Sequence, residues 1–323
     1  MNWFKPKRIF LDYASATPVL PEVRRVMEQY WSKDFYNSSA IYEEGERVKE
    51  AVEYCRANIA KILGVGKESV IFTSGGTESN VLAIRGVKPG QIVIDAESHP
   101  SVFEAAKDIG GPEITLVSSI TTDNKRGRAI REERKKNNSE YPLLHVDASQ
   151  TANYFPVGLE VLACDILTLD SAKLYGPKGI GALVVRKGVK LAIPPQGTLP
   201  VPLIAGFAKA LEIAVRDREA ERIRLESLSA GFVEAIERSL PQALVTRSLP
   251  NIVHVFVPGI LPEYLVLALD RQGVMVSAGP ACNSYKPEPP DTPVRFSFGR
   301  FTTASDVRRA AKIFCRIATS VVK

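Results

Sequence analysis

The chain has 323 residues, more than one average domain, so we expect two domains or one large α/β domain with an appendage. Hydrophobic residues make up 45% and charged residues 24%, proportions that exclude a disordered or fibrous chain. The 42 Lys and Arg against 36 Asp and Glu give a net charge of +6, a modest excess that does not by itself indicate nucleic-acid binding.

Cysteine spacing and hydropathy limit the chemistry further. The four cysteines, Cys55, Cys164, Cys282 and Cys315, form no CxxC pair, which excludes zinc-ribbon and redox-dithiol sites and argues against a disulfide scaffold. We expect no metal site. The N-terminus lacks the apolar region of a signal peptide, and no run of about 18 apolar residues occurs, so we expect a cytoplasmic protein without a membrane segment.

The first part of the chain alternates between helical and strand-like segments. Residues 21–31 and 41–63 are predicted helices, the second with an apolar stripe at three- and four-residue spacing. Strand-like runs follow at residues 70–72, 92–94, 114–117, 143–146, 166–169 and 181–185. Short apolar strands separated by helical segments indicate a mostly parallel sheet covered on both faces.

The last part of the chain has the pattern of a second, smaller unit. Residues 202–240 are helical and highly charged, which is typical of a long connector. Strands are then predicted near residues 243–245, 252–257, 274–277 and 294–298, with helices at 263–271 and from about 304. The two-domain interpretation of the length therefore agrees with the pattern.

A glycine-rich turn, FTSGGTESN at residues 72–80, follows a strand and opens a helix. Gly75 and Gly76 let the backbone turn closely, the free N–H groups of the helix start point outward, and Thr77 adds a hydroxyl. This arrangement suits a phosphate. A purely structural helix cap explains the turn equally well, because such caps are common.

Two further motifs lie at strand ends. Asp147, in HVDASQ, stands where open α/β sheets bind ligands, the alternative being a turn cap. Lys173 lies between an apolar strand and the stiff turn YGPKG, although a lone lysine there is most often solvated. Together, these motifs supply the three groups that pyridoxal phosphate (PLP) requires: an anion site for its phosphate, a carboxylate for its ring nitrogen and a lysine amine for its aldehyde.

At these residues the sequence resembles the cysteine desulfurases of the class V aminotransferase group, fold-type I enzymes that use PLP. The matching segments are FLDYASATP (10–18), FYNSS (35–39), FTSGGTES (72–79), SHPSV (98–102), HVDASQ (145–150), KLYGPKGIG (173–181), GTLPV (197–201), LPN (249–251), SAGPAC (277–282) and RFSFGRFTT (295–303). The resemblance implies an α/β fold with a large PLP-binding domain, residues 16–225, whose mostly parallel sheet lies between helices. A smaller α+β domain, residues 226–323, would follow, with residues 1–15 packing on it.

The resemblance also implies roles for single residues. Lys173 would bind the cofactor covalently and shuttle protons, Asp147 would pair with the ring nitrogen, and His99 would stack on the ring and assist acid–base steps. For His99, a helix cap beside a proline is the alternative. The other implied cofactor contacts are Gly76 and Thr77 (phosphate), Gln150 (ring hydroxyl), Ser171, Thr198 (a phosphate across a dimer interface) and Asn124. The implied substrate contacts are Arg295, on the carboxylate, and Asn37.

Cys282 is the one cysteine in a Gly/Pro-rich loop, and the resemblance makes it the nucleophile. It would take sulfur from L-cysteine as a persulfide, leave L-alanine, and pass the sulfur to an acceptor protein of iron–sulfur cluster assembly or tRNA thiolation. The family implies a homodimer. A charged surface helix explains the basic residues 125–136 better than direct nucleic-acid contact does.

The sequence departs from the family pattern at residues expected to lie near the cofactor's phosphate. Asp170 and Ala172 stand where the family has Ser and His in SxHK. An anionic Asp beside a phosphate dianion is unfavourable unless it turns away, and the loss of two donors should weaken cofactor retention, with Ser171 as a compensating donor. The segment between Cys282 and Arg295 is short and proline-rich, which limits the reach of the cysteine.

Two other functions stay open at this point. A selenocysteine lyase, or another β-eliminating class V enzyme, would keep the cofactor and change the substrate. A non-catalytic, desulfurase-like binding or assembly protein is favoured by the altered phosphate residues. It is opposed by the joint presence of Lys173, Asp147, His99, Cys282 and Arg295.

Overall fold

The computed structural model describes residues 8–194, 197–279 and 292–322. The chain divides into two compact units. The central unit is Pro18–Arg218, and the terminal unit combines Met1–Thr17 with Glu219–Lys323.

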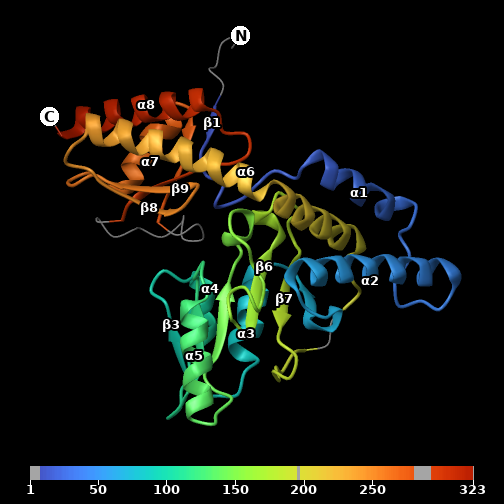
Figure 1. Cartoon of the computed structure of the whole chain (residues 1–323). Helices are drawn as coiled ribbons and strands as arrows, with labels where there is room; N and C mark the ends of the chain where they lie inside the picture. The colour runs from blue at the N-terminus through green and yellow to red at the C-terminus, as the bar shows by residue number, and fades with distance from the viewer. Residues whose placement is uncertain (1–7, 195–196, 280–291, 323) are drawn as a thin grey trace. The chain divides into compact units, whose positions relative to one another are not determined.

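A six-stranded sheet runs through the central unit (Figure 1). Its order is β2 (Val70–Thr73), β7 (Gly181–Val185), β6 (Ile166–Asp170), β5 (Leu143–Asp147), β4 (Ile114–Ser119) and β3 (Gln91–Ile94). Strands β3 to β6 are parallel neighbours, and β7 is antiparallel to both β6 and β2. The predicted mostly parallel sheet is confirmed. Because β2 therefore runs in the same direction as β5 and β6, these three strands end at one edge of the sheet.

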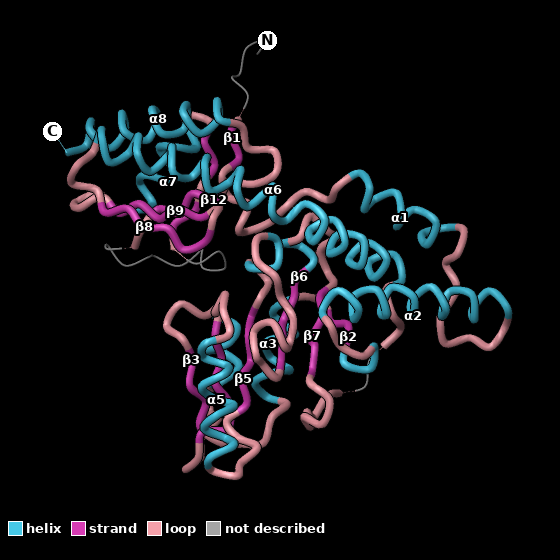
Figure 2. The backbone as a smooth tube through the Cα atoms, in the orientation of Figure 1, coloured by secondary structure: helices cyan, strands magenta, loops and turns pink. Residues whose placement is uncertain are grey.

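Helices pack along this sheet and bury its apolar side chains. The helical segments confined to the unit are α1 (Pro21–Ser32), α2 (Glu43–Leu63), η1 (Lys67–Ser69), α3 (Gly76–Arg85), α4 (Pro100–Ala106), α5 (Lys125–Lys136), η2 (Thr151–Asn153) and η3 (Ser171–Lys173). One core cluster joins Ile84 of α3 and Val102 of α4 to Leu116, Leu143 and Ile166 of the strands. Figure 2 shows α5 in front of β3 and β5.

The terminal unit has an antiparallel sheet in the order β11 (Ser277–Ala278), β12 (Val294–Ser297), β9 (Ile252–Phe256) and β8 (Leu244–Leu249). Near the N-terminus, β1 (Ile9–Phe10) pairs in parallel with β10 (Val274–Met275). The helices are α7 (Pro262–Arg271), α8 (Ala304–Val322) and the end of α6 (Val201–Ser239), which begins in the central unit.

Aromatic side chains form the core of the terminal unit. The ring of Phe296 lies 4.6 Å from that of Phe232 and 5.3 Å from that of Phe314, centroid to centroid. These three rings tie β12 to α6 and α8, and each is fully buried. Within the described part of the chain, no helix combines the length and apolar character needed to cross a membrane.

Candidate active site

The turn between β2 and α3 has the geometry of an anion cradle. Gly75 has φ +148°, a conformation that favours glycine, and α3 begins at the next residue, Gly76. A Cβ on Gly76 would lie 3.1 Å from Ser149 Oγ and 3.5 Å from Asp170 Oδ2, so side chains from two other strand ends crowd this position. The N–H groups of the first helical turn have no partner within the helix, and Thr77 is exposed there.

Asp147, the last residue of β5, is held by two donors. Asn80 Nδ2 donates to its Oδ2 at 2.8 Å, and the backbone N–H of Ser149 donates to its Oδ1 at 3.0 Å. Asn80 lies on α3, one turn after Gly76, and is buried. The orientation of the strand-end carboxylate is therefore fixed by α3 as well as by its own turn.

His99 caps α4 and is also linked to Asp147. Its Nδ1 accepts from the Ser101 N–H at 3.1 Å and lies 2.7 Å from Ser101 Oγ. That hydroxyl accepts in turn from Asn80 Nδ2 at 3.1 Å, so Asn80 bridges the aspartate and the histidine pair. Because a backbone N–H can only donate, the proton of neutral His99 lies on Nε2. Burial lowers the pKa of His99, against the opposing charge of Asp147, so the ring is neutral at pH 7.

His99 thus makes the helix cap that was its alternative interpretation, and this cap does not exclude a role in the site. Asn80 and Ser101 received no role in the sequence interpretation. The spacing of Asn80 from Gly76 was the available signal, since residues four apart share one face of a helix.

Lys173 ends η3, in the turn that follows β6. Asn153 Nδ2 donates to the Lys173 carbonyl at 2.6 Å, and the Gly176 N–H donates to the Ser171 carbonyl at 3.0 Å. A Cβ on Gly176 would lie 2.2 Å from Ser171 Oγ and 2.9 Å from Ala210 Cβ, so the turn leaves no room for a side chain there. These contacts hold the backbone that carries the half-buried lysine.

Asp170 precedes this turn and does not point away from the cradle. Its Oδ1 accepts from the Ala172 N–H at 2.9 Å, and its Oδ2 lies 3.5 Å from the position that a Cβ on Gly76 would take. Burial raises the pKa of Asp170, and the Ala172 N–H and the charge of Lys173 oppose that effect. The electrostatic influence of Asp147, Lys173 and Asp170 on His99 shows that these groups gather at one place.

Three other predicted cofactor residues, Gln150, Thr198 and Ser171, differ in their exposure to solvent. Gln150 is half-buried in the segment after β5, and Thr198 is exposed. Thr198 lines a hollow of about 310 Å³ with Thr73 and Ser74 at the start of the cradle. Ser171 is fully buried, and its Oγ has no hydrogen-bond partner among the described residues.

Asn37 and Asn124 make only local hydrogen bonds among the described residues. Asn37 Oδ1 accepts from the Ser39 N–H at 2.9 Å. Asn124 is the N-cap residue of α5, but its side chain makes no capping bond.

Arg295 lies on β12 of the terminal unit, with only 6% of its side chain exposed. Its Nη2 donates to Asp12 Oδ1 at 2.8 Å and to Ser15 Oγ at 2.9 Å, and its Nη1 donates to the Gly279 carbonyl at 3.0 Å. Its buried Nε has no partner within the described ranges. The guanidinium is thus held in place, and its Nε–H is unused.

Cys282 lies outside the described residues. For the other three cysteines, burial is the main cause of a raised pKa: to about 11 for Cys55, to about 12 for Cys164, and upward for Cys315. These three side chains are therefore protonated thiols at neutral pH, which makes them poor nucleophiles.

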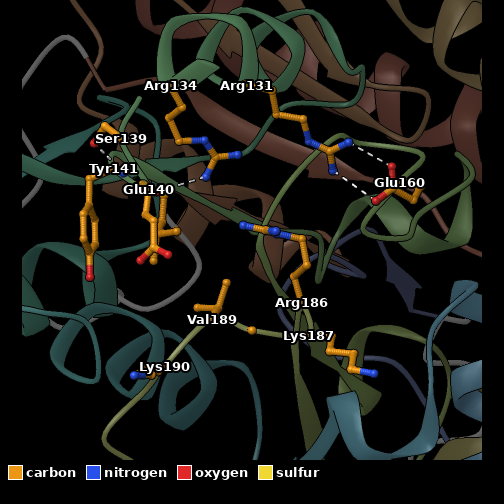
Figure 3. Close-up of a pocket in the computed structure, with 12 residues that line it drawn as sticks. Arg131, Arg134, Ser139, Glu140, Tyr141, Glu160, Arg186, Lys187, Val189 and Lys190 are labelled. Carbon is orange, nitrogen blue, oxygen red and sulfur yellow. Dashed lines mark hydrogen bonds and ion pairs between the residues drawn. The ribbon is translucent and has the colours of Figure 1, made fainter. Parts of the chain in front are cut away.

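A separate hollow of about 590 Å³ is lined by basic side chains of the central unit (Figure 3). Arg131 is bonded to Glu160 at 2.8 and 3.3 Å, and Arg134 and Arg186 point toward one another. The last two both hold the buried carboxylate of Asp165, at 2.8 and 2.7 Å. The described lining residues do not include Gly76, His99, Asp147, Asp170 or Lys173. The three arginines stabilise the fold through their ion pairs.

Comparisons with known proteins agree with this geometry. The family model "Aminotransferase class-V" matches residues 9–138, 112–196 and 195–310. The cysteine desulfurase IscS of Dictyoglomus turgidum is 31% identical over 96% of this chain and 94% of its own. The putative cysteine desulfurase NifS of Bacillus subtilis is 30% identical over 95% and 93%. A solved structure described as a NifS-like protein superposes with a TM-score of 0.85 at 25% identity, over 97% of this chain and all of that one.

Proposed function

The chain belongs to the class-V aminotransferase family, the fold-type I enzymes that use PLP, and we propose that it acts there as a cysteine desulfurase. One observation carries the proposal. The ends of β2, β5 and β6 and the start of α4 bring together a helix N-terminus at Gly76, the carboxylate of Asp147, the imidazole of His99 and Lys173.

These residues fit PLP. Asp147, fixed by two donors, is suited to the pyridine nitrogen, and the Lys173 amine to the cofactor's aldehyde. Ser149 Oγ is buried beside Gly76 without a hydrogen-bond partner in the described structure, so a ligand in the cradle would satisfy it. When bound, the cofactor supplies an electron sink for the carbon next to the substrate amine.

The remaining proposed roles follow from these positions. Lys173 Nζ carries protons to and from the substrate carbon, and neutral His99 offers its Nε2–H to the reacting groups. We assign Thr77 and Thr198 to the phosphate and Gln150 to the ring hydroxyl. Arg295, with its unused Nε, is suited to the substrate carboxylate. The proposed parts of Ser171, Asn124 and Asn37 rest on the sequence resemblance alone.

We propose Cys282 as the nucleophile, and the raised pKa values of the three other cysteines support that choice. Its thiolate forms a bond with the sulfur of L-cysteine while the carbon–sulfur bond breaks. The electron pair of that bond remains with carbon, which takes up a proton to give L-alanine. Cys282 then holds a persulfide for an acceptor protein of iron–sulfur assembly or tRNA thiolation. The nucleophile must be a reduced thiol, which the cytoplasm maintains, and we propose that the chain acts there as a homodimer.

The test is an absorption spectrum of the purified protein, reconstituted with PLP, before and after L-cysteine, with alanine quantified. We expect a cofactor band that changes on addition of L-cysteine and one alanine per sulfur released. Cys282→Ala should lose this activity, whereas a selenocysteine lyase that needs no persulfide should keep selenide release. A colourless protein that cannot be reconstituted would contradict the proposal and favour the non-catalytic alternative.

Asn80 provides a first prediction for the site. Asn80→Ala leaves Asp147 with a single donor and releases Ser101 and His99 from α3. A hydrogen bond to a charged group contributes about 1.5–3 kcal/mol, so we expect PLP affinity to fall by about tenfold or more. Fluorescence titration of the apoprotein with PLP measures this affinity. Asn58→Ala, a helical asparagine of α2, is the control, and equal affinities of both variants would exclude this positioning role.

A further inference from the structure

Asp170 occupies a position that a phosphate would need. The backbone N–H of Ala172 donates to its Oδ1 at 2.9 Å, and its side chain lies beside Gly76, the first residue of α3. A Cβ on Gly76 would lie 3.5 Å from Asp170 Oδ2. The carboxylate therefore lies at the N-terminus of α3, where the positive end of the helix dipole stabilises an anion.

The surroundings of Asp170 supply few other charges. Lys173 follows it on η3, His99 approaches from the start of α4, and Asp147 stands at the end of the neighbouring strand. His99 is neutral at pH 7, so Lys173 is the one cation among these groups. Two adjacent anions, the carboxylate and a phosphate dianion, would compete for Lys173 and for the N-terminus of α3.

We propose that Asp170 is a resident anion of the phosphate cradle, so that binding of the cofactor's phosphate requires Asp170 to take up a proton from solvent. The protonated carboxyl then donates its O–H to a phosphate oxygen, and no other bond forms or breaks. This inference rests on the proposed function, because it assumes that the cradle holds the PLP phosphate. It makes this chain's affinity for the phosphorylated cofactor fall as the pH rises.

The test measures binding of pyridoxine 5′-phosphate, which has no aldehyde to react with Lys173, by isothermal titration calorimetry of the apoprotein from pH 7 to 9. In this range the phosphate is already a dianion, since its second pKa is about 6. Wild-type affinity should fall by up to about tenfold per pH unit, with uptake of one proton. Asp170→Asn keeps a side-chain cap for Ala172 and removes the charge. It should bind at least about tenfold more tightly at pH 8 and lose the excess pH dependence.

Two controls isolate the carboxylate. Unphosphorylated pyridoxine shares the ring titrations and should bind both proteins equally. Asp108→Asn removes an exposed aspartate whose φ of +63° suits asparagine, and it should behave as wild type. Equal affinity and equal pH dependence of wild type and Asp170→Asn would overturn the inference. The proposed function is judged separately, by PLP absorbance and alanine formation, so the two failures are distinguishable.

Discussion

Lys173→Ala should lower the rate of alanine formation from L-cysteine by at least about 1000-fold without unfolding the protein. The variant loses both the covalent attachment of PLP and the group that moves protons at the substrate carbon. The turn should survive, because Asn153 bonds the carbonyl of Lys173 and not its side chain. Alanine quantification measures the rate, and the absorbance of the reconstituted protein reports the attachment.

Lys178→Ala is the matched control for this prediction. Lys178 lies five positions later in the same glycine-rich turn, but it is exposed. Its loss should leave the rate within about twofold of wild type, as expected of an exposed side chain without a structural role. A Lys173→Ala protein that kept about a tenth of the wild-type rate would contradict the assignment, since general acid–base catalysis alone is typically a factor of about 100 or more.

The parts of the site predicted from sequence are those whose geometry is local. Gly76 opens a helix directly after a strand, and Asp147 ends another, so each could be placed from its own segment. Their proximity followed from the expectation of a parallel sheet. Asn80 and Ser101 are different, because their hydrogen bond depends on how α3 packs beside α4, and periodicity carries no information on that contact.

The direction of β7 also could not be predicted from hydrophobic pattern, because a buried strand has the same pattern in either direction. The length of the segment between β6 and β7 was the available signal for this direction. β6 ends at Asp170 and β7 begins at Gly181, and a parallel crossover needs about a dozen residues or more, usually including a helix. The conflict between Asp170 and a phosphate was predicted. Its outcome depends on the turn after β6, where the Ala172 N–H holds the carboxylate beside Gly76.

The largest effect on stability is expected from Asp165→Ala. Asp165 is fully buried, accepts from Arg134 at 2.8 and 3.3 Å and from Arg186 at 2.7 Å, and also bonds the Leu144 N–H at 2.8 Å. Removing the carboxylate leaves arginine charges without a partner, Arg134 being almost fully buried. Breaking a buried ion pair in this way typically costs about 3–5 kcal/mol. For a unit of this size that lowers the melting temperature by roughly 6–20 °C.

Glu160→Ala gives the comparison that tests burial as the cause. Glu160 also binds an arginine of α5, Arg131, through two contacts, but 73% of its side chain is exposed. An exposed ion pair contributes about 0–1 kcal/mol, so this variant should melt within a few degrees of wild type. Calorimetry of both apoproteins measures the two melting temperatures. If Asp165→Ala does not fold, Asp165→Asn replaces it in the comparison. Equal shifts at the two positions would show that the buried aspartate contributes no more than a surface ion pair, because both carboxylates bind arginines of the same helix.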